Sequence, residues 1–98
     1  MDIVCNIKDS RLEMTLSGRL DTTTAPQLEA SIDSNLNGIK ELMLDFKNLE
    51  YVSSAGLRVI LSAQKVMNRQ GSMEVCNVNS TIMEVFEITG FVDILSIK

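Results

Sequence analysis

The sequence predicts an α/β fold in which helices flank a mixed β-sheet, and three observations lead to that class. Segments with the period of a strand alternate with segments with the period of a helix. Four of the five glycines lie between or at the ends of these segments. The composition, 45% hydrophobic and 22% charged, is that of an ordinary folded domain. We therefore expect residues 1–98 to form a single domain with the element order β-β-α-β-α-β-α-β.

Two short strands are expected first, at residues 2–7 and 11–17, and they form an antiparallel hairpin. In the second strand three apolar residues alternate with polar ones: Leu12, Met14 and Leu16. This alternation is the period of a sheet with one solvated face.

The first helix is predicted at about residues 24–37. Apolar residues recur there at every fourth position: Leu28, Ile32 and Leu36. Thr24 and Gln27 have the spacing of a capping box, which favours a helix start at this point. Gly38 follows as the stop signal.

The central strand is expected at residues 41–46. ELMLDF is a mostly apolar run between charges, which is typical of a strand covered on both faces. A second helix follows and ends before Gly71. Its predicted apolar stripe is widened by three further residues and consists of Leu57, Val59, Ile60, Leu61, Ala63, Val66 and Met67.

The last third of the chain repeats the alternation of strand and helix. MEVCNV at 73–78 predicts a strand, and VDILSI at 92–97 predicts a final short one. Between them Thr81 and Glu84 have the capping-box spacing of a short helix. The apolar stripe of that helix is expected in the core: Ile82, Val85 and Phe86.

The charge of the chain disfavours two classes of partner. A net charge of −4, with a pI near 4.6 and no basic run, would repel nucleic acid and anionic membranes. No stretch reaches the roughly 20 apolar residues of a membrane span, and the N-terminal segment lacks the features of a signal peptide. We therefore expect a cytoplasmic protein that binds neither nucleic acid nor membrane.

Histidine is absent, and so are the usual motifs of enzyme and cofactor sites. Without histidine the Ser-His and Cys-His nucleophile systems cannot be built. Neither zinc-ligand spacing nor a glycine-rich phosphate cradle is present. Cys5 and Cys76 each lie in an apolar run, which predicts buried, reduced thiols. We therefore predict no enzymatic activity, no metal and no cofactor.

Two loops are expected to carry the function. GRLDTTT at 18–24 and LEYVSSAG at 49–56 each leave a strand and enter a helix, where partners commonly meet sheets with parallel strands. By residue type alone, a serine directly before a helix is an N-cap whose oxygen accepts a bond from an unpaired amide. An exposed hydroxyl at a helix start is also a position where a phosphate is easily held.

Three segments carry a resemblance to a known family: SGRLDTTTAPQLE, LMLDFKNLEYVSSAGLRVIL and EVFEITGFVDIL. In their order and separation they resemble the STAS domain of bacterial anti-sigma-factor antagonists. The resemblance covers nearly the whole chain. It implies a small protein that binds an anti-sigma factor, itself a serine protein kinase, and so releases a sigma factor. It also implies that phosphorylation of one serine switches the antagonist off and that a serine phosphatase restores it.

The phosphorylated serine of the family lies in the motif Asp-Ser-Ser/Thr-Gly-Leu, where the first serine is the acceptor. Laid on SSAGL, this motif places Ser53 at the aspartate position, Ser54 at the acceptor and Ala55 at the second hydroxyl position. Gly56 and Leu57 match their counterparts. Ser54 is therefore the predicted phosphorylation site, and Ser53 is the alternative acceptor.

The predicted partner contacts come from both loops and comprise Asp21, Thr22, Thr23, Ser53, Gly56, Leu57 and Arg58. Three of them have an alternative role. Asp21 can brace its own loop, and Gly56 can serve packing against the neighbouring strand. Arg58 is either a solvated charge or a rim contact that could partly neutralise a phosphate on Ser54. Asp45 is expected to accept bonds from backbone amides near Ser54.

The resemblance leaves a second function open. The chain could be a STAS accessory or scaffold subunit that is not phosphorylated, for example in a lipid-transport or stress-sensing assembly. In that case Ser54 would serve only as a helix cap.

Overall fold

The computed structural model describes residues 1–98 and confirms the predicted order of strands and helices. A short 3-10 helix, which was not predicted, precedes the last strand. The elements are β1 (Asp2–Lys8), β2 (Arg11–Leu20), α1 (Ala25–Asn35), β3 (Glu41–Val52), α2 (Ser54–Gln70), β4 (Ser72–Cys76), α3 (Ser80–Thr89), the 3-10 helix (Phe91–Asp93) and β5 (Ser96–Ile97).

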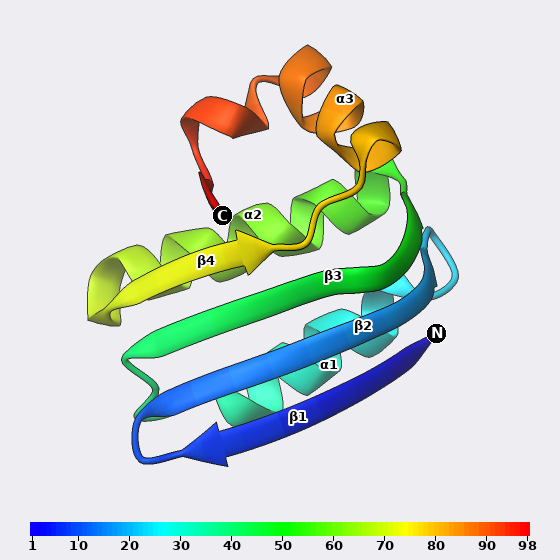
Figure 1. The fold of residues 1–98 in the computed structure, drawn as a ribbon. Coiled ribbons are helices and arrows are strands. Elements are labelled where there is room, and N and C mark those ends of the chain that lie inside the picture. Colours follow the sequence, from blue (N-terminus) through cyan, green and yellow to red (C-terminus); the bar gives the residue numbers. More distant parts are fainter.

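The five strands form one mixed sheet, as predicted, and their spatial order is β1-β2-β3-β4-β5. β1 and β2 are antiparallel, and the other neighbours are parallel. An antiparallel pair needs only a tight turn, whereas each parallel pair needs a crossover, which the helices supply. In Figure 1, α1 and α2 lie side by side on one face of the sheet, and α3 lies near the C-terminal end of β3.

The core fills the space between the sheet and these helices. Strand residues that face the helices are fully or almost fully buried: Leu12, Met14 and Leu16 of β2, and Leu42, Leu44 and Phe46 of β3. The intervening residues Glu41, Met43 and Asp45 are exposed or partly exposed. The prediction that 41–46 is covered on both faces is therefore wrong, because α1 and α2 lie on the same face.

Several element boundaries differ from the prediction. β3 continues to Val52 instead of ending at Phe46, and its pairing with β2 shifts register twice along this extension. Such irregularities bend a strand and are not visible in hydrophobic periodicity. Only Ser96–Ile97 of the predicted strand 92–97 pairs with the sheet.

Both predicted capping boxes are wrong. Thr24 precedes α1, but its hydroxyl makes no bond to a helical amide. α3 is capped by Asn79 instead of Thr81, since the Oδ1 of Asn79 accepts a bond from the Ile82 N–H at 2.8 Å. Asn79 takes the extended conformation that an N-cap requires, whereas Thr81 already lies inside the helix.

The two cysteines are free thiols, but they are less buried than predicted. Cys5 is exposed and Cys76 is partly exposed. Cys5 belongs to β1, which is an edge strand of the sheet. An apolar run in an edge strand does not ensure burial, because no neighbouring strand covers the free edge. No helix of the structure is both long enough and apolar enough to cross a bilayer.

Candidate functional site

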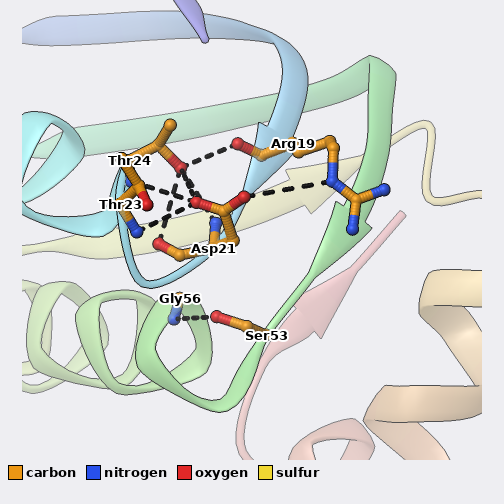
Figure 2. A network of polar contacts seen from close by, with 6 residues as sticks. All are labelled: Arg19, Asp21, Thr23, Thr24, Ser53 and Gly56. Carbon is orange, nitrogen blue, oxygen red and sulfur yellow. Dashed lines mark hydrogen bonds and ion pairs between the residues drawn. The ribbon is translucent and has the colours of Figure 1, made fainter.

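The two predicted loops meet at one end of the sheet. The Ser53 N–H, at the end of β3, donates to the carbonyl oxygen of Leu20, the last residue of β2, at 2.8 Å. Figure 2 shows the start of α2 facing the loop between β2 and α1. This junction fixes the position of the first turn of α2 relative to residues 21–24.

Ser53 is the N-cap of α2. Its backbone is extended, with φ −91° and ψ 175°, and its Oγ accepts a bond from the Gly56 N–H at 3.3 Å. Its carbonyl oxygen accepts the Leu57 N–H at 2.9 Å. The alternative in which Ser54 serves as the cap is therefore wrong, because the preceding serine already fills that role.

Ser54 is the first residue of α2 and is exposed to solvent. Its hydroxyl makes no hydrogen bond within the protein. The N–H groups of Ser54 and Ala55 lie ahead of the first intrahelical bond and have no acceptor in the chain. A free hydroxyl thus stands beside unpaired amides at the positive end of a helix of 17 residues.

Asp21 braces its own loop. One carboxylate oxygen, Oδ1, accepts the N–H groups of Thr23 at 3.0 Å and Thr24 at 3.1 Å (Figure 2). The Thr24 hydroxyl closes the loop further, since it donates to the Arg19 carbonyl at 2.7 Å and accepts the Asp21 N–H at 2.9 Å. The hydrogen bond from the Thr24 amide is the main reason that the pKa of Asp21 lies below its ordinary value.

The loop around Asp21 is expected to loosen at low pH. Because folding lowers the pKa of Asp21, its contribution to loop order is present above the ordinary carboxyl pKa of about 4 and is lost as the pH falls through the lowered value. Two-dimensional NMR should show the amide signals of Thr23 and Thr24 moving together in this range. Asp21→Asn should abolish the shift, whereas Asp33→Asn, an exposed change on α1, should leave it intact.

Arg19 and Tyr51 form a contact that the sequence did not reveal. The guanidinium carbon of Arg19 lies 4.4 Å from the centroid of the Tyr51 ring. The Nε of Arg19 lies 3.9 Å from Oδ2 of Asp21. This chain of contacts links the loop to the end of β3. Arg19 and Tyr51 are opposite one another only because of the two register shifts between β2 and β3, so strand periodicity could not pair them.

The two loops frame a shallow hollow between the starts of α1 and α2, lined by Thr22, Ala25, Pro26, Glu29, Ala55, Arg58 and Val59. We call the exposed residues of the first loop and of the start of α2, Thr22, Thr23, Ser54 and Arg58, the docking face. Thr22 and Arg58 line the hollow itself. Arg58 has no carboxylate within ion-pair distance, so its charge is free to meet a ligand. The hollow combines an apolar floor with a polar rim, as protein-binding surfaces do.

Gly56 and Leu57, two of the predicted partner contacts, are buried. Leu57 is part of the core, and Gly56 lies against β2. A Cβ placed on Gly56 would come within 2.6 Å of Leu20 Cγ and 3.1 Å of the Leu20 carbonyl oxygen. Gly56 and Leu57 therefore pack beneath the docking face and help to position it. The partner contacts that we propose come from the exposed residues of the docking face.

Gly56→Ala is expected to destabilise the protein by about 1–3 kcal/mol, the usual cost of overpacking. Leu20 is fully buried and cannot swing away, so α2 must shift from β2. The higher helix propensity of alanine offsets at most about 1 kcal/mol of this loss. Urea unfolding measures the change, with the exposed Ser62→Ala on the same helix as control. An unchanged midpoint for Gly56→Ala would show that the contact with Leu20 is not tight.

Asp45 does not reach the docking face, contrary to expectation. Its Oδ1 accepts bonds from the Lys47 N–H and from Nδ2 of Asn77, both at 2.9 Å. Burial tends to raise the pKa of the Asp45 carboxyl, but these bonds and the Lys47 charge outweigh it, so the pKa is lowered. The prediction failed because β3 continues past Asp45 to Val52, which carries the strand end and Ser54 away from it.

Comparison with known proteins decides the family. A family model of the STAS domain matches residues 2–98. The chain belongs to the STAS domain family. It is 37% identical over 91 residues to BtrV of Bordetella bronchiseptica, which is named for a proposed role as an anti-sigma factor antagonist; the match covers 91% of this chain and 78% of BtrV.

Solved structures share the STAS fold. The crystal structure of an anti-sigma factor antagonist from Mycobacterium paratuberculosis superposes with a TM-score of 0.89 at 20% identity, covering 98% of this chain and 83% of that one. The anti-sigma factor antagonist SpoIIAA in its unphosphorylated form has a TM-score of 0.78 at 17% identity, covering 99% and 87% of the two chains. SpoIIAA in its phosphorylated form gives a TM-score of 0.77 at 18% identity, covering 99% and 91%. At these identities the likeness shows the common fold.

Proposed function

We propose that this STAS protein is an anti-sigma-factor antagonist whose binding is switched off by phosphorylation of Ser54. Its partner would be an anti-sigma factor that is also a serine protein kinase, and a serine phosphatase would reverse the modification. The protein would act by binding and would itself be a substrate, not an enzyme. The observation that carries the proposal is the exposed, unbonded hydroxyl of Ser54 within the docking face. The names of the relatives, and the existence of SpoIIAA in two phosphorylation states, support it.

Ser54 is the better acceptor of the two neighbouring serines. The Ser53 oxygen already accepts the Gly56 N–H, and its backbone N–H is bonded to Leu20, so a phosphate on Ser53 would disrupt the helix cap. Serine and aspartate are about equally favoured at an N-cap, so Ser53 can supply the capping oxygen at the position where the family has aspartate. The exchange therefore removes a charge from the site without removing its cap.

A phosphate on Ser54 should leave the fold intact. It adds roughly −1.5 to −2 charges at the positive end of α2, next to unpaired amides, which favours the modified form. Arg58 follows four residues later, and side chains at this spacing are neighbours on a helix surface. The free guanidinium of Arg58 can therefore pair with the phosphate. That pairing would also withdraw Arg58 from any acidic group of the partner.

The modification should instead act at the interface. A partner that packs over the docking face must desolvate the phosphate on Ser54. This costs several kcal/mol unless a cationic side chain of the partner pairs with the phosphate. Each 1.4 kcal/mol changes the affinity tenfold, so a cost of about 3 kcal/mol weakens binding more than a hundredfold. No large rearrangement of the antagonist is required.

The proposal is tested by incubating the purified protein with ATP and the candidate anti-sigma factor kinases of its own organism. Peptide mass spectrometry should find one added phosphate on Ser54. The phosphate should be absent from Ser54→Ala and should persist in Ser53→Asn, which keeps a capping side chain. If an isolated partner binds but no phosphate is transferred, the accessory or scaffold role described for the family becomes the better assignment.

A further inference from the structure

The outer strand β1 has a free edge along its whole length. It lies at one side of the sheet, whereas the opposite edge is formed by the two-residue strand β5. β1 contains neither proline nor glycine, and its seven residues pair with β2 without a register shift. Val4 is 55% exposed and Ile7 is 54% exposed. A long, regular and partly apolar edge of this kind is a template for pairing with another strand.

The backbone of β1 shows which groups are available. Lys8 and Arg11 close a two-residue turn, so this pair exchanges both of its hydrogen bonds. Because the pattern alternates along an antiparallel ladder, the even-numbered residues of β1 bond to β2. The N–H and C=O groups of Ile3, Cys5 and Ile7 therefore point outward from the sheet.

A second copy of the chain fits this edge in one antiparallel register. With Cys5 opposite Cys5 of the second copy, Ile3 stands opposite Ile7, and all three outward-facing residues of each strand are paired. Six inter-strand hydrogen bonds can then form. Other antiparallel registers leave at least one of these residues without an outward-facing counterpart.

The same register makes the side chains complementary. Asp2 is placed opposite Lys8 of the second copy, and the two-fold symmetry repeats this ion pair at the other end of the strand. Ile3 and Ile7 form two apolar pairs. Opposite charges and apolar pairs across a ladder are each stabilising. The backbone pattern and the side-chain pattern thus select the same register independently.

Helix α1, which lies over β1, leaves room for such a partner. Two contacts connect them: Cys5 Sγ lies 3.7 Å from Ser31 Oγ, and Gln27 Nε2 donates to the Met1 carbonyl oxygen at 3.1 Å. The acidic residues of α1, Glu29 and Asp33, are instead turned toward α2, where they line a hollow between the two helices. The flank of α1 above the free edge is therefore uncharged, and two copies would not repel each other there.

We propose that two copies of this protein associate through β1 into a dimer with a continuous ten-stranded sheet. One pair of strands buries little surface, so the dimer should be weak and concentration-dependent. The docking faces lie away from the centre of the paired strands, and the symmetry would direct them to opposite ends of the dimer. The dimer does not depend on Ser54 or on its phosphorylation.

Sedimentation velocity over a range of protein concentrations should show a reversible monomer-dimer equilibrium. A short bismaleimide should cross-link Cys76→Ser, which retains Cys5, into a covalent dimer. Cys5→Ser, which retains the partly exposed Cys76, should give none. A protein that stays monomeric at high concentration, or that cross-links through Cys76 alone, would overturn the proposal.

A charge exchange tests the register itself. Asp2→Lys or Lys8→Asp alone should weaken the dimer about tenfold, because two attractive cross-strand pairs become repulsive. The double variant Asp2→Lys/Lys8→Asp should recover the original dissociation constant. Circular dichroism of each monomer controls for folding. If the dissociation constant does not change in the single variants, the dimer uses a different surface, and the proposal that β1 pairs with β1 is wrong.

Discussion

Ser54→Asp is expected to weaken binding of the anti-sigma factor by roughly a hundredfold, equivalent to about 3 kcal/mol. The reason is local: a carboxylate at the first residue of α2 must be desolvated when the partner covers the docking face. The free energy of unfolding should stay the same or rise slightly, because a negative charge at this end of a helix is favourable. Isothermal titration calorimetry measures the affinity, and urea unfolding measures the stability.

Two further variants make this result specific. Ser54→Ala should bind far more tightly than Ser54→Asp, since it places no charge in the docking face. Ser72→Asp adds the same charge at an exposed position beyond the far end of α2 and should leave the affinity unchanged. If Ser72→Asp weakens binding as much as Ser54→Asp, the effect comes from net charge, and the docking face is elsewhere.

Phe86→Ala is expected to destabilise the protein by about 3–5 kcal/mol, the usual cost of truncating a buried phenylalanine. Phe86 is fully buried, and its ring centroid lies 6.2 Å from those of Phe46 and Phe91. Its removal leaves a cavity where α3 and the 3-10 helix pack against Phe46 of β3. A domain of this size has a total stability of roughly 5–15 kcal/mol, so the variant should be close to unfolding.

Urea unfolding, followed by circular dichroism, checks this expectation. Ile88→Ala is the matched control, because Ile88 lies on the same helix but is 85% exposed, so its truncation should cost less than about 0.5 kcal/mol. A loss below about 1 kcal/mol for Phe86→Ala would mean that α3 is only loosely attached to the sheet.

The order of elements could be predicted because periodicity reports it directly. Leu12, Met14 and Leu16 alternate, and Leu28, Ile32 and Leu36 recur every fourth residue; all six are buried in the structure. The length of β3 could not be predicted in the same way. Its extension follows two register shifts against β2, and these arise from pairing between strands that the pattern of one segment does not contain.

The candidate site was predicted in part. The meeting of the two loops follows from the rule for strand ends in parallel sheets, and the family motif pointed to Ser54. Which of two adjacent serines caps α2 depends on the backbone conformation of Ser53, which residue type cannot give. For the same reason Asn79, in place of Thr81, was missed as the cap of α3.

The central claim is that negative charge on Ser54 stops docking while the domain stays folded. The most direct test is the affinity of one protein sample for its isolated anti-sigma factor in three states: unmodified, phosphorylated on Ser54, and phosphorylated and then treated with a serine phosphatase. We expect tight binding, a loss of roughly a hundredfold, and full recovery, with the same circular dichroism spectrum throughout. Equal affinity in the three states would contradict the account.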